Sequence, residues 1–495
     1  VGDIITIPSQ SLAYGSGAIG TNAIITLQGN DIINQNAFTL ETLSEGIIMN
    51  SVSPLNSDGS LESGSIDNLR YEIQSPDTDT GTFSLLVRQG NDDTLNPITL
   101  ETFSNLSLDP KQPNYIEKII GNQVESIQTD GSDKYLDVTG NYTNQSRYIR
   151  VKSVNSATPD YLDNSGDPKT AFTASIPIAS TGSFEGAIGS NIPVEAGLYY
   201  NNITDTQTQG LVAADYNDAI SLLRNKDEFQ YNFITVPGLI KDFASHTSTL
   251  NTLVSNCQER GDTMAIIDLV NYQSTILTAT TEAKSINSSF AAAYWPWVQT
   301  LDPSTGQQVF VPASTLIPGV YAFNDAAAEV WNAPAGTTRG AMSTAIRAER
   351  KLTKTNRDDL YKANVNPIVT LPTTGVTVFG QKTLKKKQSA TDRINVRRLL
   401  IELKTQIGNL ADNLVFEQNT AATRNDFLAQ VNPLLSSIQQ RQGLTDFKVI
   451  MDETNNTPNI IDNNQLIGAI FIKPTKTAEF ISLNFNITST GADFS

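Results

Sequence analysis

The last quarter of this chain decides its fold, and it begins with DRINVRRLLIELKTQIG at residues 392–408. This stretch predicts a helix over residues 392–415, because at about 100° per residue its Val, Leu and Ile side chains fall on one broad face. A narrow basic stripe lies beside that face and consists of Arg393, Arg397 and Lys404. We therefore expect the helix to be packed on most of its circumference, with only the basic stripe free.

A second helix and a strand follow, and we read the order of this part as α-α-β-β. The second helix is predicted over residues 423–441, and Gly443 marks its end. The sequence ISLNFNIT at residues 481–488 alternates apolar and polar side chains with period two, as a strand buried on one face does. Its apolar set is Ile481, Leu483, Phe485 and Ile487. This strand is free to pair with its own sheet or with that of a neighbour.

The middle of the chain alternates strands and helices. Strands are expected in three runs, at residues 229–236, 264–270 and 291–298. The second run is nearly all apolar, which is typical of a strand buried on both faces. A helix over residues 245–260 precedes it, and Gly261 predicts where that helix ends. Strand, helix and strand in this order imply a parallel sheet. Further helices are expected after Pro318 and over residues 342–362.

The N-terminal part has a different texture. Short runs rich in β-branched residues, such as TFSLLVRQ at residues 82–89, are separated by Gly, Asp, Asn and Pro. Together these patterns predict an α+β multidomain protein with a β-rich N-terminal part, a central α/β layer and a C-terminal α-α-β-β domain. The predicted domains are residues 1–190, 191–375 and 376–495.

Composition excludes several classes of protein. No apolar run approaches the ~18 residues of a membrane-spanning helix. One cysteine, Cys257, and one histidine, His246, rule out an intramolecular disulfide and zinc sites built from several such ligands. The start, VGDIITIPSQ, lacks both a secretory signal and an initiator Met, which indicates a processed or incomplete N-terminus.

Charge is segregated along the chain. The formal net charge is −17. Residues 1–200 hold 9 Lys and Arg against 24 Asp and Glu, whereas residues 339–410 hold 15 against 5. An acidic outside and a basic inside would explain this distribution.

No catalytic, cofactor or metal site is predicted. Residues 15–20 match G-x-G-x-x-G, but a strand-like sequence follows where the dinucleotide motif requires a helix, so a glycine-rich turn is favoured. His246 and Cys257 lie 11 residues apart on one predicted helix, about 16 Å along its axis, which is too far for a base and its nucleophile. The adjacent acid pairs are expected to be solvated: Asp92–Asp93, Asp358–Asp359 and Asp452–Glu453.

Basic residues offer the better candidate surface. A run of three lysines precedes the helical stripe and consists of Lys385, Lys386 and Lys387. Nucleic-acid binding is disfavoured, because aromatic residues do not interleave with these cations and the protein as a whole is acidic. Two readings stay open: a solvated face, or a surface that contacts an acidic protein.

Several long strings resemble contractile tail sheath proteins of myoviruses, over roughly residues 200–495. They are GVYAFND at 319–325, WNAPAGTTRG at 331–340, NNTPNIID at 455–462 and ISLNFNITSTGADF at 481–494. The resemblance implies a structural subunit, not an enzyme, that forms stacked hexameric rings around a tail tube and contracts to drive the tube through the host envelope. It implies a C-terminal sheath core domain that faces the tube and β-rich insertions that face outward.

The same resemblance implies the subunit's partners and location. The partners would be further copies of the chain, the tail tube protein, and the baseplate and tail terminator proteins, with no cofactor, no nucleic acid and no direct membrane insertion. The location would be the virion, after assembly in the host cytoplasm. The basic residues named above would face the tube, and the alternating strand would be exchanged between subunits. Members usually begin with an arm strand, which is not found upstream of Val1; either this phage lacks it or the sequence starts inside the family's pattern.

Two alternatives remain open at this stage. One is a sheath of a bacteriocin or other contractile injection system, which is the same class of protein. The other is an extracellular carbohydrate-active or adhesive β-protein. That class needs clustered acids or aromatic residues in a cleft, and the central α/β pattern argues against it.

Overall fold

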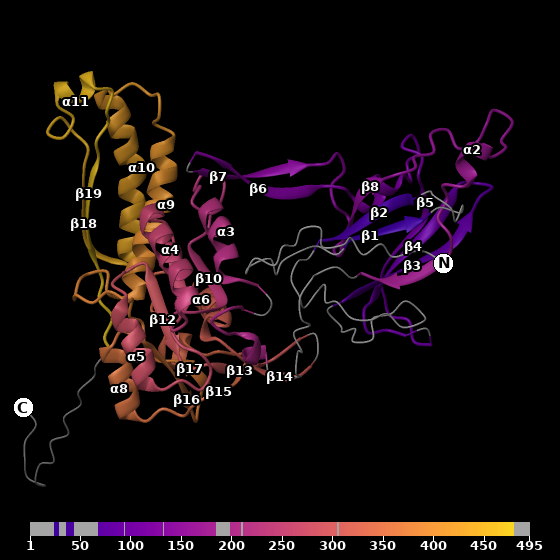
Figure 1. The fold of residues 1–495 in the computed structure, drawn as a ribbon. Coiled ribbons are helices and arrows are strands. Elements are labelled where there is room, and N and C mark those ends of the chain that lie inside the picture. Colours follow the sequence, from indigo (N-terminus) through magenta and orange to yellow (C-terminus); the bar gives the residue numbers. More distant parts are fainter. Residues whose placement is uncertain are drawn as a thin grey trace, which may run out of the picture.

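The computed structural model describes residues 24–28, 36–43, 68–93, 95–131, 133–184, 199–208, 211–303 and 306–479. The glycine motif at residues 15–20 and the alternating strand at residues 481–487 lie outside these ranges. Figure 1 shows two lobes: a β-rich lobe formed by the N-terminal part, and a larger lobe of helices and strands formed by the rest. Within the described ranges, no helix has both the length and the apolar character needed to cross a bilayer.

The β-rich lobe contains two antiparallel sheets, with strand orders β1-β2-β8 and β5-β4-β3-β9. The strands are β1 (Ile24–Gln28), β2 (Asn36–Thr42), β3 (Leu69–Asp77), β4 (Thr82–Gln89), β5 (Thr99–Ser107), β8 (Ile149–Val154) and β9 (Ser180–Ser183). Phe38 and Phe83 stack across the core with ring centroids 5.4 Å apart. The strand expected after the glycine motif is present as β1.

One member of the acid pair Asp92–Asp93 is not solvated, contrary to the prediction. Asp92 is buried, not solvated, and its carboxylate joins two arginines. Arg70 Nη1 lies 2.7 Å from Asp92 Oδ1, and Arg88 Nε lies 2.7 Å from Asp92 Oδ2. Sequence adjacency cannot reveal this network, because both arginines come from neighbouring strands of the folded sheet.

A β-hairpin connects the lobes (Figure 1). Its strands, β6 (Val124–Asp130) and β7 (Asp133–Thr139), form a separate two-stranded sheet that reaches helix α3 (Tyr216–Leu222). Lys134 Nζ on β7 lies 3.1 Å from Asp218 Oδ1 on α3. The pair is partly exposed, so it adds little stability and mainly marks where the hairpin meets the larger lobe.

The larger lobe is built on a five-stranded sheet with strand order β10-β11-β12-β16-β17. The strands are β10 (Phe233–Ile240), β11 (Met264–Asp268), β12 (Ala291–Trp295), β16 (Asn366–Leu371) and β17 (Gly375–Val378). The first four are parallel and β17 is antiparallel to β16. The predicted parallel pairing is thus confirmed.

Helices cover both faces of this sheet. Ala265 and Ile267 of β11 pack in one core with α4 (Ala244–Arg260), α5 (Ile276–Ser285) and α8 (Lys354–Lys362). Met264 and Ile266 face the other core, with α6 (Ile317–Ala327) and α9 (Ile394–Asp412). Burial on both faces explains why the β11 sequence is apolar at nearly every position. Gly261 ends α4 in the left-handed conformation, with φ of 72°, as the sequence predicts.

Two predicted elements are different in the structure. The strand expected over residues 291–298 ends at Trp295, and Val298 begins β13 (Val298–Leu301) of another sheet. That sheet has the order β14-β13-β15 and also contains β14 (Gln308–Val311) and β15 (Ala345–Ala348). The helix expected over residues 342–362 is therefore a strand followed by α8. Pairing of β15 with β13 overrides the local helical pattern, which is a tertiary effect.

The C-terminal part contains the two predicted helices, and two strands follow them; the predicted strand at residues 481–487 is neither of these and lies outside the described residues. After α9 come α10 (Ala421–Gln440), β18 (Leu444–Ile450), a short helix α11 (Pro458–Asp462) and β19 (Ala469–Pro474). Its core includes Leu399 and Leu403 of α9, together with Phe427, Val431 and Leu435 of α10. The broad apolar face predicted for the first helix is therefore the face that packs here.

Candidate functional site

The basic stripe of α9 does not lie free, and this prediction is wrong for its central residue. Arg397 is only 7% exposed. Its Nε donates to the Ser289 carbonyl at 3.2 Å, its Nη2 donates to Ser289 Oγ, and its guanidinium lies 3.9 Å from the ring centroid of Phe290. Burial lowers the pKa of Arg397 to about 10. Helical periodicity identified the stripe correctly, but it cannot show that the loop between α5 and β12 packs against it.

The two ends of the basic stripe, Arg393 and Lys404, differ in how far their charges are paired within the subunit. Arg393 pairs with Glu479, through Nε to Oε1 at 2.6 Å and Nη2 to Oε2 at 3.0 Å, and also with Asp392 at 3.0 Å. Lys404 is exposed. Its ammonium lies beside Gly261, where an added Cβ would stand 2.8 Å from Nζ. A cation is favourable there, because α4 ends at Gly261 and the C-terminus of a helix carries a partial negative charge.

The lysine run is more accessible. Lys386 and Lys387 are exposed and Lys385 is partly buried. The Lys386 backbone N–H donates to Asn287 Oδ1 at 3.1 Å, which fixes the backbone of the run. Of the six basic candidates, three therefore present exposed side chains: Lys386, Lys387 and Lys404. Their proposed contact with a tube stays a prediction.

The β18–β19 hairpin is a second candidate surface. It forms a two-stranded sheet, and no third strand pairs with it in the described part of the chain. One face packs on the C-terminal core through Val449 and Ile470, while Phe471 on the other face is 58% exposed. Unpaired strand edges offer backbone N–H and C=O groups to an incoming strand. The candidate strand itself, with Ile481, Leu483, Phe485 and Ile487, lies outside the described residues.

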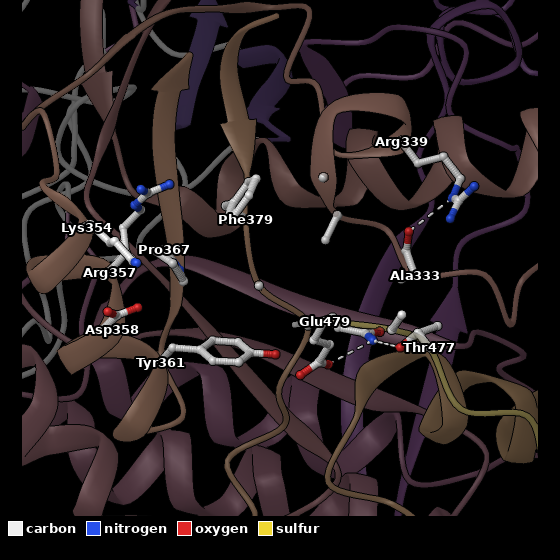
Figure 2. Close-up of a pocket in the computed structure, with 15 residues that line it drawn as sticks. Ala333, Arg339, Lys354, Arg357, Asp358, Tyr361, Pro367, Phe379, Thr477 and Glu479 are labelled. Atoms are coloured by element: carbon white, nitrogen blue, oxygen red, sulfur yellow. Dashed lines mark hydrogen bonds between the residues drawn. The ribbon is translucent and has the colours of Figure 1, made fainter. Parts of the chain in front are cut away.

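Glu479 is a functional candidate that sequence reasoning missed. Besides Arg393, it receives a hydrogen bond from Gln381 Nε2 at 3.2 Å, and the Tyr361 hydroxyl points toward it (Figure 2). Burial alone would raise the pKa of Glu479, but hydrogen bonds from Arg393 and Tyr361 and the charge of Arg393 lower it below its usual value. The sequence offered a signal that could have found it: Glu479 is the sole acid between Asp462 and Asp493, and it lies two residues before the predicted strand.

Glu479 also lines a groove with a volume of about 540 Å³ (Figure 2). One wall comes from α8, the opposite wall from α7 (Gly336–Arg339) and the third from residues 477–479. Phe379 lies between the α7 and α8 walls and is 43% exposed, with the Arg357 guanidinium 5.4 Å from its ring centroid. Arg339 and Lys354 add two further cations at the groove.

The remaining candidates have structural roles. His246 is buried, and its Nδ1 accepts the Ile240 N–H at 3.0 Å. Cys257 is buried in the α4 core, and burial raises the pKa of its thiol to about 12. Within the described ranges, no cluster of three or more His, Cys, Asp or Glu side chains could hold a metal ion.

Models of known protein families match the larger of the two lobes. Residues 209–384 match the family model described as the phage tail sheath protein central domain, and residues 386–488 match the phage tail sheath C-terminal domain. Together the two matches cover more than half of the chain. The strands of the β-rich lobe, which end at Ser183, lie outside both matches.

Individual relatives agree with the family models. The chain is 37% identical over 210 residues to the tail sheath protein of Vibrio phage KVP40, which is 42% of this chain and 31% of the relative. It is 34% identical over 232 residues to the tail sheath protein of Enterobacteria phage T4, which is 47% of this chain and 35% of the relative. The chain thus spans about a third of the length of these curated relatives. A solved structure of the anti-feeding prophage helical sheath in its contracted state covers 61% of this chain and is itself 84% covered, with 21% identity and a TM-score of 0.47.

Proposed function

This chain belongs to the phage tail sheath family, and from that membership we propose that it is a structural subunit of a contractile tail sheath, not an enzyme. Subunits polymerise as stacked hexameric rings around the tail tube, and contraction drives the tube through the host envelope. The observation that carries the proposal is the match, in order along one chain, to the central and the C-terminal sheath domains. The partners are further copies of the chain, the tube protein, and the baseplate and terminator proteins in the virion, after assembly in the host cytoplasm.

In this proposal the C-terminal domain, residues 376–495, faces the tube, residues 191–375 form the central layer and residues 1–190 face outward. The segregated charge supports this orientation, since the acidic excess lies in residues 1–200 and the basic excess in residues 339–410. The three exposed lysines, Lys386, Lys387 and Lys404, contact acidic groups of the tube. Such contacts are individually weak and screened by salt, which suits an interface that must release along the whole tail.

Strand exchange supplies continuity between subunits. The β18–β19 hairpin has unpaired edges in the described part of the chain, and the alternating stretch at residues 481–487 is suited to pair with such an edge. Each net hydrogen bond of the added strand would contribute about 0.5–1.5 kcal/mol. A strand of this length therefore resists pulling, while each subunit rotates as a rigid body during contraction.

Negative-stain electron microscopy of the purified protein, with and without its tube protein, tests the proposal. Long striated tubules or stacked six-fold rings are the expected result. Dispersed monomers in both samples would contradict it.

A further inference from the structure

We propose that the groove between α7 and α8 is a receptor for residues 491–495 of a second copy of this chain. The tail that follows an exchanged strand would thereby be clamped onto the subunit that receives the strand. This inference rests on the proposed function, because strand exchange is what brings the tail of one copy to the surface of another.

The groove has the chemistry of a receptor for an acidic and aromatic segment. Its floor is apolar and includes Phe379, Pro367 and the small side chains of Ala333 and Ala335. Within the described residues, none of the three cations around it makes an ion pair with an acid: Arg339, Lys354 and Arg357. Of the two acids that line the groove, Glu479 is neutralised by Arg393, and Asp358 leaves the three cations in excess. The groove therefore offers an aromatic surface at the centre and unpaired positive charge beside it.

The tail of the chain has the complementary chemistry. In residues 480–495 the one ionisable side chain is Asp493, and Phe494 follows it directly. A carboxylate beside Lys354 and Arg357 would pair with cations that lack an acid, and an aromatic ring on Phe379 would cover exposed apolar surface. The flanking residues Gly491, Ala492 and Ser495 are small enough to follow the groove between α7 and α8.

The geometry of the β18–β19 hairpin determines where the tail of an added strand leads. β19 ends at Pro474, and the same chain reaches the groove wall three residues later, at Thr477. A strand that pairs antiparallel to the free edge of β18 runs parallel to β19 and ends beside Leu444, whose partner on β19 is Pro474. From residue 488 to Asp493 the incoming chain has five residues, about 17 Å when extended at ~3.3 Å each. The receiving chain covers about 10 Å in its three residues, and two interstrand spacings of about 4.8 Å separate the added strand from β19, so about 17 Å of chain is long enough for Asp493 to reach the groove.

The occupant is a second copy and not the chain's own tail. The chain's own segment starts at the groove, because Glu479 is fixed there by Arg393 and Gln381. In the proposed function its residues 481–487 leave to pair with a neighbour. The residues after them are carried to that neighbour's groove.

Cysteine cross-linking in assembled sheaths tests the docking. The variant carries Ala335→Cys in the groove and Ser495→Cys in the tail, which leaves Asp493 and Phe494 unchanged. The native Cys257 gives a low background, since it is buried and burial raises its pKa to about 12. After mild oxidation and alkylation of free thiols, non-reducing electrophoresis should show a ladder of covalent oligomers. Each single-cysteine variant should remain monomeric.

A charge reversal provides the matched control. Lys354→Glu with Arg357→Glu should lower the ladder yield about fivefold, as expected for partly exposed ion pairs, and Asp493→Lys should restore it. Lys362→Glu on the same helix lies outside the groove and should change nothing.

The outcomes separate the two proposals. Tubules that form without any ladder would overturn tail docking and leave the sheath function intact. A faster-moving cross-linked monomer in place of the ladder would show that the chain's own tail fills the groove, which also overturns the inference. Absence of tubules under all conditions would overturn both.

Discussion

Arg393 at the start of α9 holds Glu479, 86 residues further along the chain, with two parallel hydrogen bonds of 2.6 and 3.0 Å. A guanidinium and a carboxylate that meet in this way fix both position and direction. The pair therefore sets where the C-terminal segment leaves its domain. Arg393 acts within the subunit, and its charge is not available to a tube.

Glu479→Gln should loosen the C-terminal segment without unfolding the domain. The substitution keeps the shape of the side chain but removes the charge that the Arg393 guanidinium binds. Because the pair is partly exposed, we expect a loss of about 1 kcal/mol in unfolding free energy. Hydrogen exchange of residues 475–479 should become faster, whereas exchange in α9 should not. Glu453→Gln, at an exposed acid of the same domain, is the control.

The same pair should respond to acid. The pKa of Glu479 is lowered in the folded state, so its contribution is present above the unfolded pKa, about 4.5, and is lost as pH falls through the folded pKa. Protection factors at residues 475–479, which correct for the intrinsic pH dependence of amide exchange, should therefore fall on acidification in the native protein and stay low at all pH values in Glu479→Gln. An unchanged pH profile in that variant would show that another group controls the segment.

Arg397→Glu should destabilise the isolated subunit, whereas Lys404→Glu should not. The first change buries a carboxylate against the Ser289 carbonyl and removes the contact with the Phe290 ring, and such changes cost about 3 kcal/mol or more. The second affects an exposed ammonium, with an expected effect near 0.5 kcal/mol. Chemical denaturation of both variants measures the difference. Equal midpoints would contradict the burial of Arg397.

Tube contact should consequently be tested with the exposed lysines. Lys386→Glu, Lys387→Glu and Lys404→Glu combined should weaken sheath assembly on tubes, most strongly at low salt, with unchanged thermal unfolding of the monomer. Co-sedimentation with tubes measures the effect. Normal assembly of this triple variant at low salt would remove the electrostatic part of the proposed tube contact.

Sequence periodicity predicted those helices and strands whose burial can be read from the spacing of their own apolar residues. The nearly all-apolar run of β11 is typical of a strand between two layers of helices, and the repeat of Leu and Ile along α9 indicates a packed face. The stop at Gly261 also follows from local chemistry, because a left-handed residue ends a helix.

Contacts between distant segments could not be predicted in this way. Arg397 is polar at a position where helical periodicity assigns a free face, and its burial depends on Ser289, 108 residues away in sequence. Asp92 stands in a polar loop sequence, yet two strands direct arginines at it. No local sequence pattern predicts the groove, since α7, α8 and the C-terminal segment, which line it, are far apart in the sequence.

Asp268→Asn should change how stability depends on pH. Asp268 at the end of β11 is buried, and burial raises its pKa to about 7, although hydrogen bonds from the Ser314 N–H and hydroxyl oppose the shift. A raised pKa means that the folded state keeps a proton that the unfolded state releases above about pH 4. The stability contributed by the group is therefore lost as pH rises toward 7.

Unfolding free energies at pH 5 and pH 7 measure this effect. Relative to Asp268→Asn, the native protein should lose about 2 kcal/mol between the two values, since one proton corresponds to ~1.4 kcal/mol per pH unit at most. Asp446→Asn, at an exposed acid, is the control. Parallel pH profiles of the native protein and Asp268→Asn would show that Asp268 titrates normally.

Leu483→Pro should abolish sheath polymerisation while leaving the monomer folded. Proline removes one backbone N–H of the predicted exchange strand and fixes its φ, so the strand cannot complete a ladder with the β18–β19 hairpin. Leu483→Ile keeps the N–H and the apolar side chain and should polymerise normally. Electron microscopy of both variants with the tube protein gives the readout, and circular dichroism checks that each monomer is folded. Tubules of normal length from Leu483→Pro would mean that residues 481–487 do not hold subunits together by strand pairing. The open edges of the β18–β19 hairpin would then have to be covered by a different segment of the chain.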